Sequence, residues 1–535
     1  MTPDDPHALA AARRRRIIFQ DDILANDAFR RGEVGPSRLE RLIAFYMSRL
    51  EAAPNQIDSV WHEWGEGNTA VWPSEVLPRT ENVFPGWWEA GIDPVRVLLD
   101  ETRKRGREVF FSYRINGSDN DDLFDPPHPL KGPVPLKARH RDWLIHKWHV
   151  YWDFRREGVR GLKLEVLREV AAMYDYDGIS VDFARVPVLF PEGEQWKHRD
   201  LLTGFIREVR SALHGIARRR GRPYLLAARI PEDIPGCRFD GIDVETWVAE
   251  GVVDILAIGT RTAAADVAGF RALTSGTPVR VYPSWDDHHS SDGYRHPTVE
   301  VWRGVCANWW RQNPDGMHTF NLMFPSPESE RGLGIEAAPE HRRGGLDGGA
   351  LLSDWETQCR VFAEIGSPGT LEGRDKVFLV ERRGGGHGSD FVPAPDDWRT
   401  PRHCYFQTNM RAQLPAELGA GGSPDTLLTL DVADDLGAAA DSLDSLTLNL
   451  ALTADPEEAA GDLQLEVRIN NLLLGAPVRE TGIATRLNAG FDCWLVFSVP
   501  PRFLAKGANL VGVCRTDRTA AAVRIEKLEL HVRYA

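Results

Sequence analysis

Acidic and basic side chains stand directly after several short apolar runs of this sequence. Asp182 and Arg185 follow one run, Glu232 follows a second, and Asp286 follows a third. Cleavage of a glycosidic bond needs two carboxyl groups, one that protonates the leaving oxygen and one that is ionised. These residue types therefore predict acid/base hydrolysis of a glycosidic bond, through an oxocarbenium-like transition state.

Each candidate catalytic residue has an expected role. We expect Asp182 to be the nucleophile or the ionised stabiliser, and Arg185 to keep it ionised or to bind substrate. Glu232 and Asp286 are both candidates for the general acid, and the sequence does not choose between them. Structural alternatives stay open: Asp182 could only cap its strand or pair with Arg185, and Glu232 could be a solvated loop residue. Asp286 could belong to a polar turn.

Further polar and aromatic residues follow the same runs and are expected to bind substrate. Sugar hydroxyl groups need paired donors and acceptors, and sugar rings stack on indole faces. The chain has 17 Trp against 10 Tyr, which favours indole as the stacking group. The expected substrate-binding residues are His62, Glu63, Trp64, Arg114, Asn116, Arg185, Arg229, Trp285, Asp287, His288 and Asn321.

Metal and cofactor signatures are weak in this sequence. His288 and His289 follow two aspartates, but consecutive residues of an extended segment point in opposite directions, so one ion cannot easily use both. The HExxH spacing, a CxxC pair and a glycine-rich dinucleotide fingerprint are all absent from the sequence. We expect neither a metal nor a cofactor.

Eight short apolar runs, each followed by a segment of helical periodicity, must position these residues. The runs are 16–20, 57–61, 108–115, 178–183, 224–230, 253–258, 279–282 and 318–323. The helices are expected near 36–53, 93–105, 162–174, 195–220, 244–250, 264–273, 299–312 and 353–365. Continuous apolar runs are typical of parallel strands covered on both faces. Eight such units predict the α/β fold class with a (β/α)8 TIM barrel over residues 1–366, whose strands end at one catalytic mouth.

The pattern changes after residue 366. Short alternating runs separated by turn residues follow, at 427–430, 445–450, 463–469, 493–499, 510–514 and 523–532. This spacing predicts an all-β sandwich, jelly-roll-like, as an accessory domain over residues 367–535.

The segment 176–185, which reads YDGISVDFAR, resembles the fourth-strand signature of uncharacterised glycosyl-hydrolase-like (β/α)8 barrel families. Segments 229–232, 241–247 and 251–256 resemble further parts of these families, so the resemblance spans about residues 15–330. It extends distantly to α-amylase and α-galactosidase barrels, and it implies that Asp182 is the nucleophile.

The sequence departs from the α-amylase pattern at one point near this aspartate. That pattern has an arginine two residues before the nucleophile, where this chain has Ser180, and Arg185 follows the aspartate instead. In the last third of the chain, segments 467–471 and 504–511 resemble accessory β-sandwiches of carbohydrate enzymes with galactose-binding-like topology.

Composition limits the partners. The 64 Lys and Arg against 78 Asp and Glu give a formal net charge of −14, which disfavours nucleic acid. The sequence has no apolar run long enough to span a membrane. The segment 1–16 lacks the apolar core of a secretory signal, so a cytoplasmic location is expected. The expected partner is an oligo- or polysaccharide; its sugar and linkage, the stereochemical outcome and the oligomeric state stay open.

Two other functions remain compatible with these residues. The first is a barrel that binds carbohydrate without cleaving it. The second is a metal-dependent lyase or isomerase, because the same fold carries many chemistries.

Overall fold

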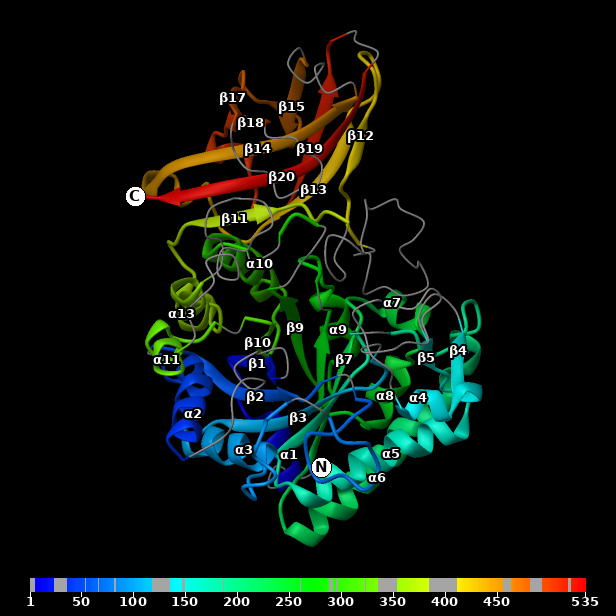
Figure 1. Cartoon of the computed structure of the whole chain (residues 1–535). Helices are drawn as coiled ribbons and strands as arrows, with labels where there is room; N and C mark the ends of the chain where they lie inside the picture. The colour runs from blue at the N-terminus through cyan, green and yellow to red at the C-terminus, as the bar shows by residue number, and fades with distance from the viewer. Residues whose placement is uncertain are drawn as a thin grey trace.

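A closed barrel of parallel strands forms the first part of the chain (Figure 1). Around the barrel the strands follow each other as β1, β2, β3, β6, β7, β8, β9 and β10. Their bounds are β1 (Ile17–Asp22), β2 (Ile57–Glu63), β3 (Glu108–Arg114), β6 (Gly178–Asp182), β7 (Leu225–Ile230), β8 (Ile255–Ile258), β9 (Arg280–Asp286) and β10 (Met317–Phe320). The predicted (β/α)8 barrel is confirmed.

The computed structural model describes most, but not all, of the chain. The described residues are 5–23, 36–52, 54–65, 67–80, 83–117, 135–146, 150–185, 187–259, 261–287, 292–294, 297–322, 324–334, 354–383, 411–455, 463–481, 493–517 and 521–535. Among them, no helix combines the length and the apolar character that crossing a bilayer requires.

A principal helix follows each barrel strand. These helices are α2 (Pro36–Glu51), α3 (Pro94–Lys104), α5 (Glu157–Met173), α6 (Arg199–Arg220), α8 (Val244–Glu250), α9 (Val267–Leu273), α10 (Val299–Trp310) and α13 (Trp355–Glu364). Local chemistry fixes their ends: Asp93 caps α3 through the amides of Val95 and Arg96, and Gly221 ends α6 in the left-handed conformation. The predicted helices therefore exist, although α5 begins five residues earlier than expected.

Several short elements lie outside the predicted pattern. They are the helices α1 (Pro6–Ala12), α4 (Pro135–Arg139), α7 (Ile234–Phe239) and α11 (Pro327–Gly332), and the hairpin of β4 (Leu144–His146) and β5 (Val150–Trp152). Elements this short contain too few residues to show a clear hydrophobic period.

The barrel interior changes from apolar to polar along its axis. Side chains alternate between the interior and the surrounding helices along each strand. Near the amino-terminal ends of the strands, the buried interior cluster consists of Ile18, Trp61, Phe110, Leu225, Ala227, Ile255, Ala257 and Tyr282. Above it lie the buried polar residues Gln20, Ser112, Ser180, Ser284 and His318. Apolar side chains thus fill the barrel at the amino-terminal ends of its strands, and the polar interior residues lie toward the carboxyl ends.

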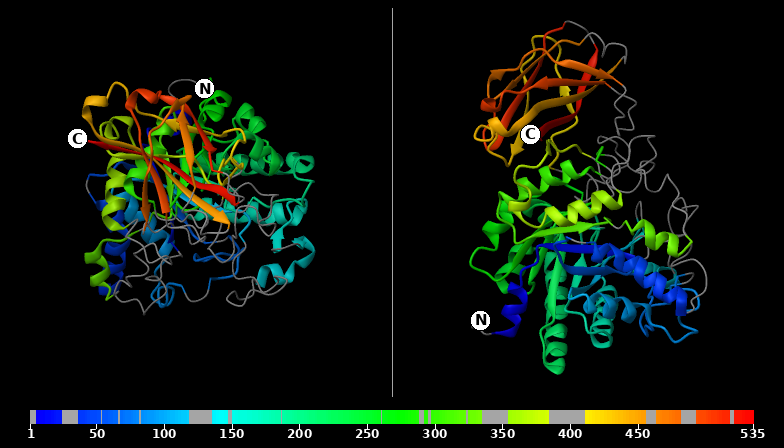
Figure 2. Two further views of the ribbon diagram at one scale, coloured as in Figure 1. Left: turned by 90° about the horizontal axis from the view of Figure 1, so that it is seen from above. Right: turned by 90° about the vertical axis from the view of Figure 1, so that its left-hand side faces the viewer.

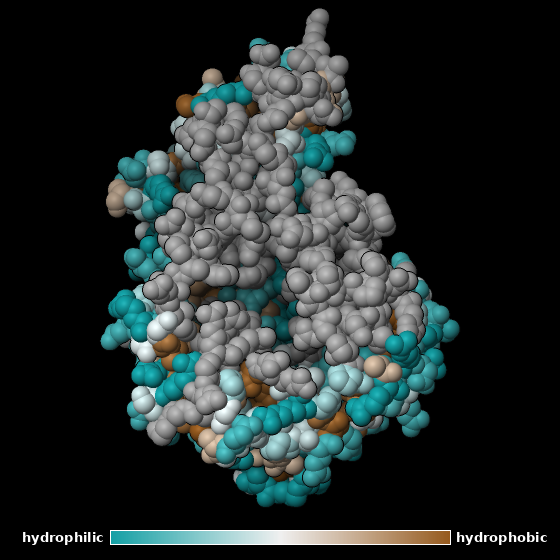
Figure 3. All heavy atoms as spheres, in the orientation of Figure 1, coloured by the Kyte–Doolittle hydropathy of each residue, from teal (hydrophilic) through white to brown (hydrophobic). Residues whose placement is uncertain are grey.

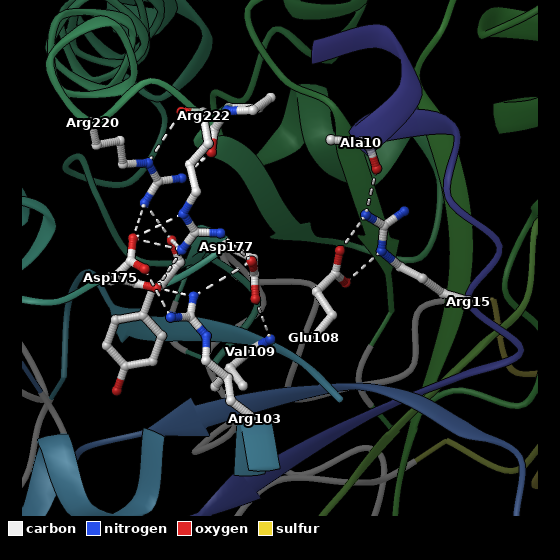
Figure 4. A network of polar contacts seen from close by, with 11 residues as sticks. Ala10, Arg15, Arg103, Glu108, Val109, Asp175, Asp177, Arg220 and Arg222 are labelled. Atoms are coloured by element: carbon white, nitrogen blue, oxygen red, sulfur yellow. Dashed lines mark hydrogen bonds and ion pairs between the residues drawn. The ribbon is translucent and has the colours of Figure 1, made fainter. Parts of the chain in front are cut away.

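A buried ion pair closes the amino-terminal end of the barrel (Figure 4). The Arg15 guanidinium donates to both carboxylate oxygens of Glu108, each at 2.7 Å, and to the carbonyls of Ala10 and Ala11. Arg15 lies just before β1 and Glu108 begins β3. The pair therefore ties two strand starts to the end of helix α1.

A second ionic cluster lies beside the first (Figure 4). Arg103, Arg220 and Arg222 converge on Asp175 and Asp177, which directly precede β6. These contacts join helices α3 and α6 to the strand that ends at Asp182, so they help to fix that strand from below.

Two antiparallel sheets form the last part of the chain and share one buried core. The first contains β11 (Lys376–Leu379), β20 (Ala522–Tyr534), β14 (Leu443–Asp455), β18 (Cys493–Ser498) and β17 (Val478–Thr481), with β12 (Ala416–Leu418) paired to β20. The second contains β13 (Thr426–Val432), β19 (Gly507–Arg515), β15 (Leu465–Ile469) and β16 (Leu472–Leu473). The predicted all-β sandwich is confirmed. The predicted boundary at 366/367 lies between α13 and β11 and stays a prediction.

The sandwich lies next to helix α10 of the barrel, with β11 between them (Figures 1 and 2). A side chain at Gly304 of α10 would overlap the carbonyl oxygen of Val377 in β11, so this close approach requires glycine. Arg303, on the same helix, binds both carboxylate oxygens of buried Glu364 and the carbonyl of Asp375. Barrel and sandwich are therefore joined by a close backbone approach at Gly304 and by the hydrogen bond from Arg303 to the Asp375 carbonyl, while the Arg303–Glu364 pair ties α10 to α13.

Removal of the Glu108 carboxylate should destabilise the barrel. Its partner Arg15 is completely buried, so Glu108→Ala leaves a guanidinium without a counter-charge or water. Breaking a buried ion pair in this way costs about 3–5 kcal/mol. The free energy of unfolding, measured by urea denaturation, should fall by that amount. Glu250→Ala, which breaks an exposed pair with Arg207, is the control and should have little effect. Equal, small losses for both variants would contradict this assignment.

Candidate active site

Charged side chains crowd the carboxyl ends of the barrel strands. Side chains alternate along each strand between the barrel interior and the helices, so the last inward-facing residues of neighbouring strands lie in one layer. These residues are Asp22 of β1, Glu63 of β2, Arg114 of β3, Asp182 of β6, Arg229 of β7 and Asp286 of β9. The strand register pairs Asp22 with Glu63, Arg114 with Asp182, and Asp182 with Arg229. This layer forms the candidate active site. In Figure 3, hydrophilic atoms are visible in a hollow near the middle of the face shown.

Asp182 is held by hydrogen bonds at both carboxylate oxygens. Nη1 of Arg229 donates to Oδ2 at 2.9 Å, and the backbone N–H of Arg185 donates to Oδ1 at 2.9 Å. The Asp182 and Arg229 side chains are both completely buried. The Arg229 guanidinium also lies 4.5 Å from the ring centre of Phe320 on β10. These contacts fix the orientation of the Asp182 carboxylate and pair it with a cation.

Glu63 is the second buried carboxyl group of this layer, and its hydrogen-bond partners are neutral. Its Oε2 accepts from Ser112 Oγ at 2.8 Å and from Gln20 Nε2 at 3.2 Å, whereas its buried Oε1 has no hydrogen-bond partner among the described residues. Burial raises the pKa of Glu63 well above its usual value; Asp182 and Asp22 act in the same direction, and Arg114 and Ser112 act against it. Burial and the two neighbouring carboxylates therefore favour the protonated form of Glu63 over the ionised form.

Asp22 and Arg114 form an ion pair next to Glu63. Nη2 of Arg114 donates to Oδ2 of Asp22 at 2.7 Å, and the guanidinium lies 5.7 Å from the Phe320 ring centre. The Asp22 side chain is 15% exposed, more than its partner at 5%. This pair is thus nearer to solvent than Asp182 and Arg229.

Asp286 has a guanidinium and an amide as partners. Nε and Nη2 of Arg261 each lie 3.1 Å from Oδ2, and Asn321 Nδ2 donates to Oδ1 at 2.8 Å. Asn321 reaches this position with a φ of 59°, in the left-handed region that asparagine tolerates better than most residues. Burial lowers the pKa of Arg261 to about 10, and Asp286 opposes the shift. Arg261 therefore stays charged at neutral pH and favours an ionised Asp286.

The site combines three carboxylates that are paired with guanidinium groups and one carboxyl group, Glu63, whose bonded partners are neutral. Three guanidinium–carboxylate pairs surround the mouth, as buried charges must be paired. Glu63 alone among the four carboxyl groups of the layer lacks such a bonded cation. Groups of this kind can accept and donate protons and bind hydroxyl groups of a ligand. In the described part of the chain, no three His, Cys, Asp or Glu side chains lie together as ligands for a metal ion.

Three of the predicted substrate-binding residues lie on the outer face of the strands instead. His62 packs among Tyr46, Trp64 and Tyr176, and burial lowers its pKa to about 3. Nε1 of Trp64 donates to the Tyr176 hydroxyl at 3.2 Å. The ring of Trp285 lies edge-on to Trp302 of α10, 4.7 Å between ring centres. The structure does not bring these three side chains to the mouth; they pack the barrel against its helices.

The remaining predicted residues lie around the mouth in different ways. Asn116 holds the β5 segment, because its side chain accepts from the Trp152 amide and donates to two backbone carbonyls. Asp287 is buried next to Asp286, and its backbone N–H donates to the Phe320 carbonyl at 2.9 Å. Glu232 is buried in the loop after β7. His288 lies outside the described residues.

Several mouth residues were not among the predicted site residues. They are Gln20, Asp22, Ser112, Arg261 and Phe320. Strand alternation could have found Asp22: it shares the inward side with Ile18 and Gln20, whereas Asp21 faces outward and pairs with Arg49 of α2 at 2.8 Å.

Comparison with known proteins gives a partial sequence match. No protein-family model matches the chain. Over 133 residues it is 27% identical to the curated protein glycosyl hydrolase DigH from Escherichia coli strain K12, and equally to the protein of that name from Shigella flexneri. The match covers 24% of this chain and 30% of either relative, so the chain spans less than a third of their length.

Solved structures overlap with the chain at low scores. One is α-L-fucosidase isoenzyme 2 from Paenibacillus thiaminolyticus, with a TM-score of 0.38 and 12% identity over 62% of this chain and 50% of that one. Another is a GH36 α-galactosidase from Geobacillus stearothermophilus, with a TM-score of 0.34 and 12% identity over 98% and 56%. A third is an α-amylase from Geobacillus thermoleovorans, with a TM-score of 0.33 and 13% identity over 94% and 99%. At these scores the solved structures carry no argument about the family or function of this chain.

Proposed function

We propose that this protein is a glycoside hydrolase that cleaves an oligo- or polysaccharide at the mouth of the barrel. One observation carries the proposal: two buried carboxyl groups lie in one layer in opposite environments. Asp182 is bonded to a guanidinium, whereas Glu63 is bonded to neutral groups and its pKa is raised. An ionised carboxylate and a protonated carboxyl group are the two components that glycoside hydrolysis needs. The partial similarity to glycosyl hydrolase DigH supports the same chemistry.

In the proposed reaction, Asp182 is the nucleophile or the carboxylate that stabilises the oxocarbenium-like transition state. Arg229 and the Arg185 amide keep it ionised and oriented. Glu63 donates its proton to the leaving oxygen through Oε1, the oxygen that makes no hydrogen bond to any described residue. Ser112 holds the other oxygen of Glu63 in place.

The two acid candidates from the sequence take different places in this proposal. Asp286 accepts hydrogen bonds at both oxygens from Arg261 and Asn321, which favours its ionised form. We therefore assign Asp286 to binding sugar hydroxyl groups. Glu232 stays the second candidate for the proton donor, because it is buried beside the mouth. Arg114 and Asn321 are proposed to bind further hydroxyl groups.

The substrate can be found with a panel of oligo- and polysaccharides, with release of reducing ends as the readout. The proposal expects turnover on at least one of them. Binding without any turnover would favour the alternative of a non-catalytic carbohydrate-binding barrel. Turnover that is lost after treatment with a chelator and restored by a metal would favour the metal-dependent alternative.

Asp182→Asn should remove most of the turnover. The amide cannot act as a nucleophile or carry the negative charge, so kcat should fall by roughly 10²–10⁴-fold on the substrate found by the panel. Asp254→Asn is the matched control: it also removes a buried carboxylate that is bonded to an arginine, Arg210, at 2.7 Å, but at the other end of the barrel. The control should lose stability and keep kcat. Full activity of Asp182→Asn would contradict its role.

Glu63→Gln should change how the rate depends on pH and on the leaving group. Because the protonated form is the active one, the wild-type rate should fall as the pH rises through the raised pKa of Glu63, and this alkaline limb should vanish in the variant. The loss of rate should be large for a natural glycan. It should be small for an aryl glycoside whose leaving group needs no proton. Glu232→Gln is the comparison variant. If only Glu232→Gln shows this leaving-group dependence, Glu63 is not the proton donor.

A further inference from the structure

The C-terminal sandwich places a buried carboxylate in a loop of the barrel mouth. Glu381 follows β11, and its carboxylate accepts three hydrogen bonds from the loop after β8. The donors are Thr262 Oγ1 at 2.6 Å, the Ala263 amide at 2.9 Å and the Ala264 amide at 3.0 Å. A residue more than a hundred positions away in sequence thus provides the hydrogen-bond acceptor for two backbone amides of this loop.

The loop that Glu381 holds also carries Arg261, the partner of Asp286. It begins at Gly259, whose φ of 81° suits glycine, and an added Cβ there would lie only 3.0 Å from Thr262. Arg261 directly precedes Thr262, and its guanidinium binds Asp286 Oδ2. The position of the Arg261 side chain therefore depends on how the next three residues are held.

Contacts within the sandwich fix Glu381 itself. Its carbonyl accepts from the amides of Gln413 and Leu414, both at 3.1 Å. The next residue, Arg382, forms a buried ion pair with Glu526 of β20 at 3.0 Å. Glu381 is thus fixed to the sandwich through its backbone, and the three hydrogen bonds that its side chain accepts connect the sandwich to the barrel loop.

The contact between Glu381 and the loop after β8 is buried, so water cannot easily replace the Glu381 side chain as the hydrogen-bond acceptor. Burial raises the pKa of Glu381 to about 8, while the hydrogen bonds from Thr262 and Ala263 act in the opposite direction. The two amides of the loop would lose their acceptor if the carboxylate were removed. Buried donors without an acceptor are costly, so the loop would have to move to regain partners.

The sandwich holds a second mouth loop as well. Lys527 of β20 donates to the carbonyl of Gly293 at 2.6 Å, and its ammonium lies 4.1 Å from the ring centre of Tyr294. These residues follow β9, the strand that ends at Asp286. Arg411 also pairs with Asp233, next to Glu232, at 3.1 Å. Contacts from the sandwich thus reach the loops after β7, β8 and β9.

We propose that Glu381 is a positioning residue that holds the loop after β8 and, through it, sets Arg261 against Asp286. The sandwich is then a structural part of the active site and not a separate accessory module. The catalytic consequence rests on the proposed function, whereas the effect on the loop does not.

Hydrogen–deuterium exchange of the full-length protein tests the positioning without any substrate. In Glu381→Gln, the amide group cannot accept from all three donors, so the peptide covering 259–266 should exchange faster than in the wild type. Thr262→Val removes only one of the three donors and should give a smaller change in the same direction. Asp431→Ala is the control, because it breaks an exposed contact of the sandwich with Arg311 of α10. Unchanged exchange of 259–266 in Glu381→Gln would overturn the proposal.

A double-mutant cycle tests the consequence for catalysis. Misplacing a group at the site by about 1 Å can cost roughly a hundredfold in rate. Glu381→Gln should therefore lower kcat/KM by about tenfold to a hundredfold. In the Arg261→Lys background, Glu381→Gln should cause almost no further loss of kcat/KM. Asp431→Ala should have little effect on kcat/KM in either background. Faster exchange with unchanged kcat/KM, or losses that add fully with Arg261→Lys, would overturn the positioning role. If Asp182→Asn retained full turnover, only the proposed reaction would fail.

Discussion

Burial of charge at the carboxyl end of the barrel is the constraint on which the site depends. Asp182 and Arg229 are both completely buried and lie on neighbouring strands, so each must satisfy the other. The same rule pairs Asp22 with Arg114, and Asp286 with Arg261. Because the cations are already bonded to other carboxylates, Glu63 keeps only neutral partners. Burial therefore raises the pKa of Glu63, and no bonded cation offsets the shift.

The fold was largely predictable, because its signals are local. Eight apolar runs followed by helical segments correspond to eight strands and eight principal helices, and alternating runs after residue 366 correspond to the two sheets. The site was predictable only in part. Asp182 and Asp286 end their strands, Arg229 is the last residue but one of β7, and all three face inward, so position along the chain was sufficient to find them.

Position along the chain did not show which side chains at a strand end point into the barrel and which point toward the helices. His62 and Glu63 are adjacent at the end of β2, yet one packs against the helices and the other faces the interior. Trp285 and Asp286 divide in the same way at the end of β9. An indole at a strand end predicts a stacking surface for sugar, whereas Trp285 packs against helix α10. Contacts between distant segments, such as Glu381 with the loop after β8, leave no local pattern in the sequence.

Because Glu63 is buried without a bonded cation, we expect it to be protonated at neutral pH, and infrared difference spectroscopy measures this directly. The spectrum of Glu63→Gln, subtracted from that of the wild type at pH 7, isolates the signal of this one carboxyl group. We expect the carbonyl stretch of a protonated carboxylic acid, which shifts when the protein is transferred to deuterated water. The symmetric and antisymmetric stretches of a carboxylate in its place would show that Glu63 is ionised and is not the proton donor.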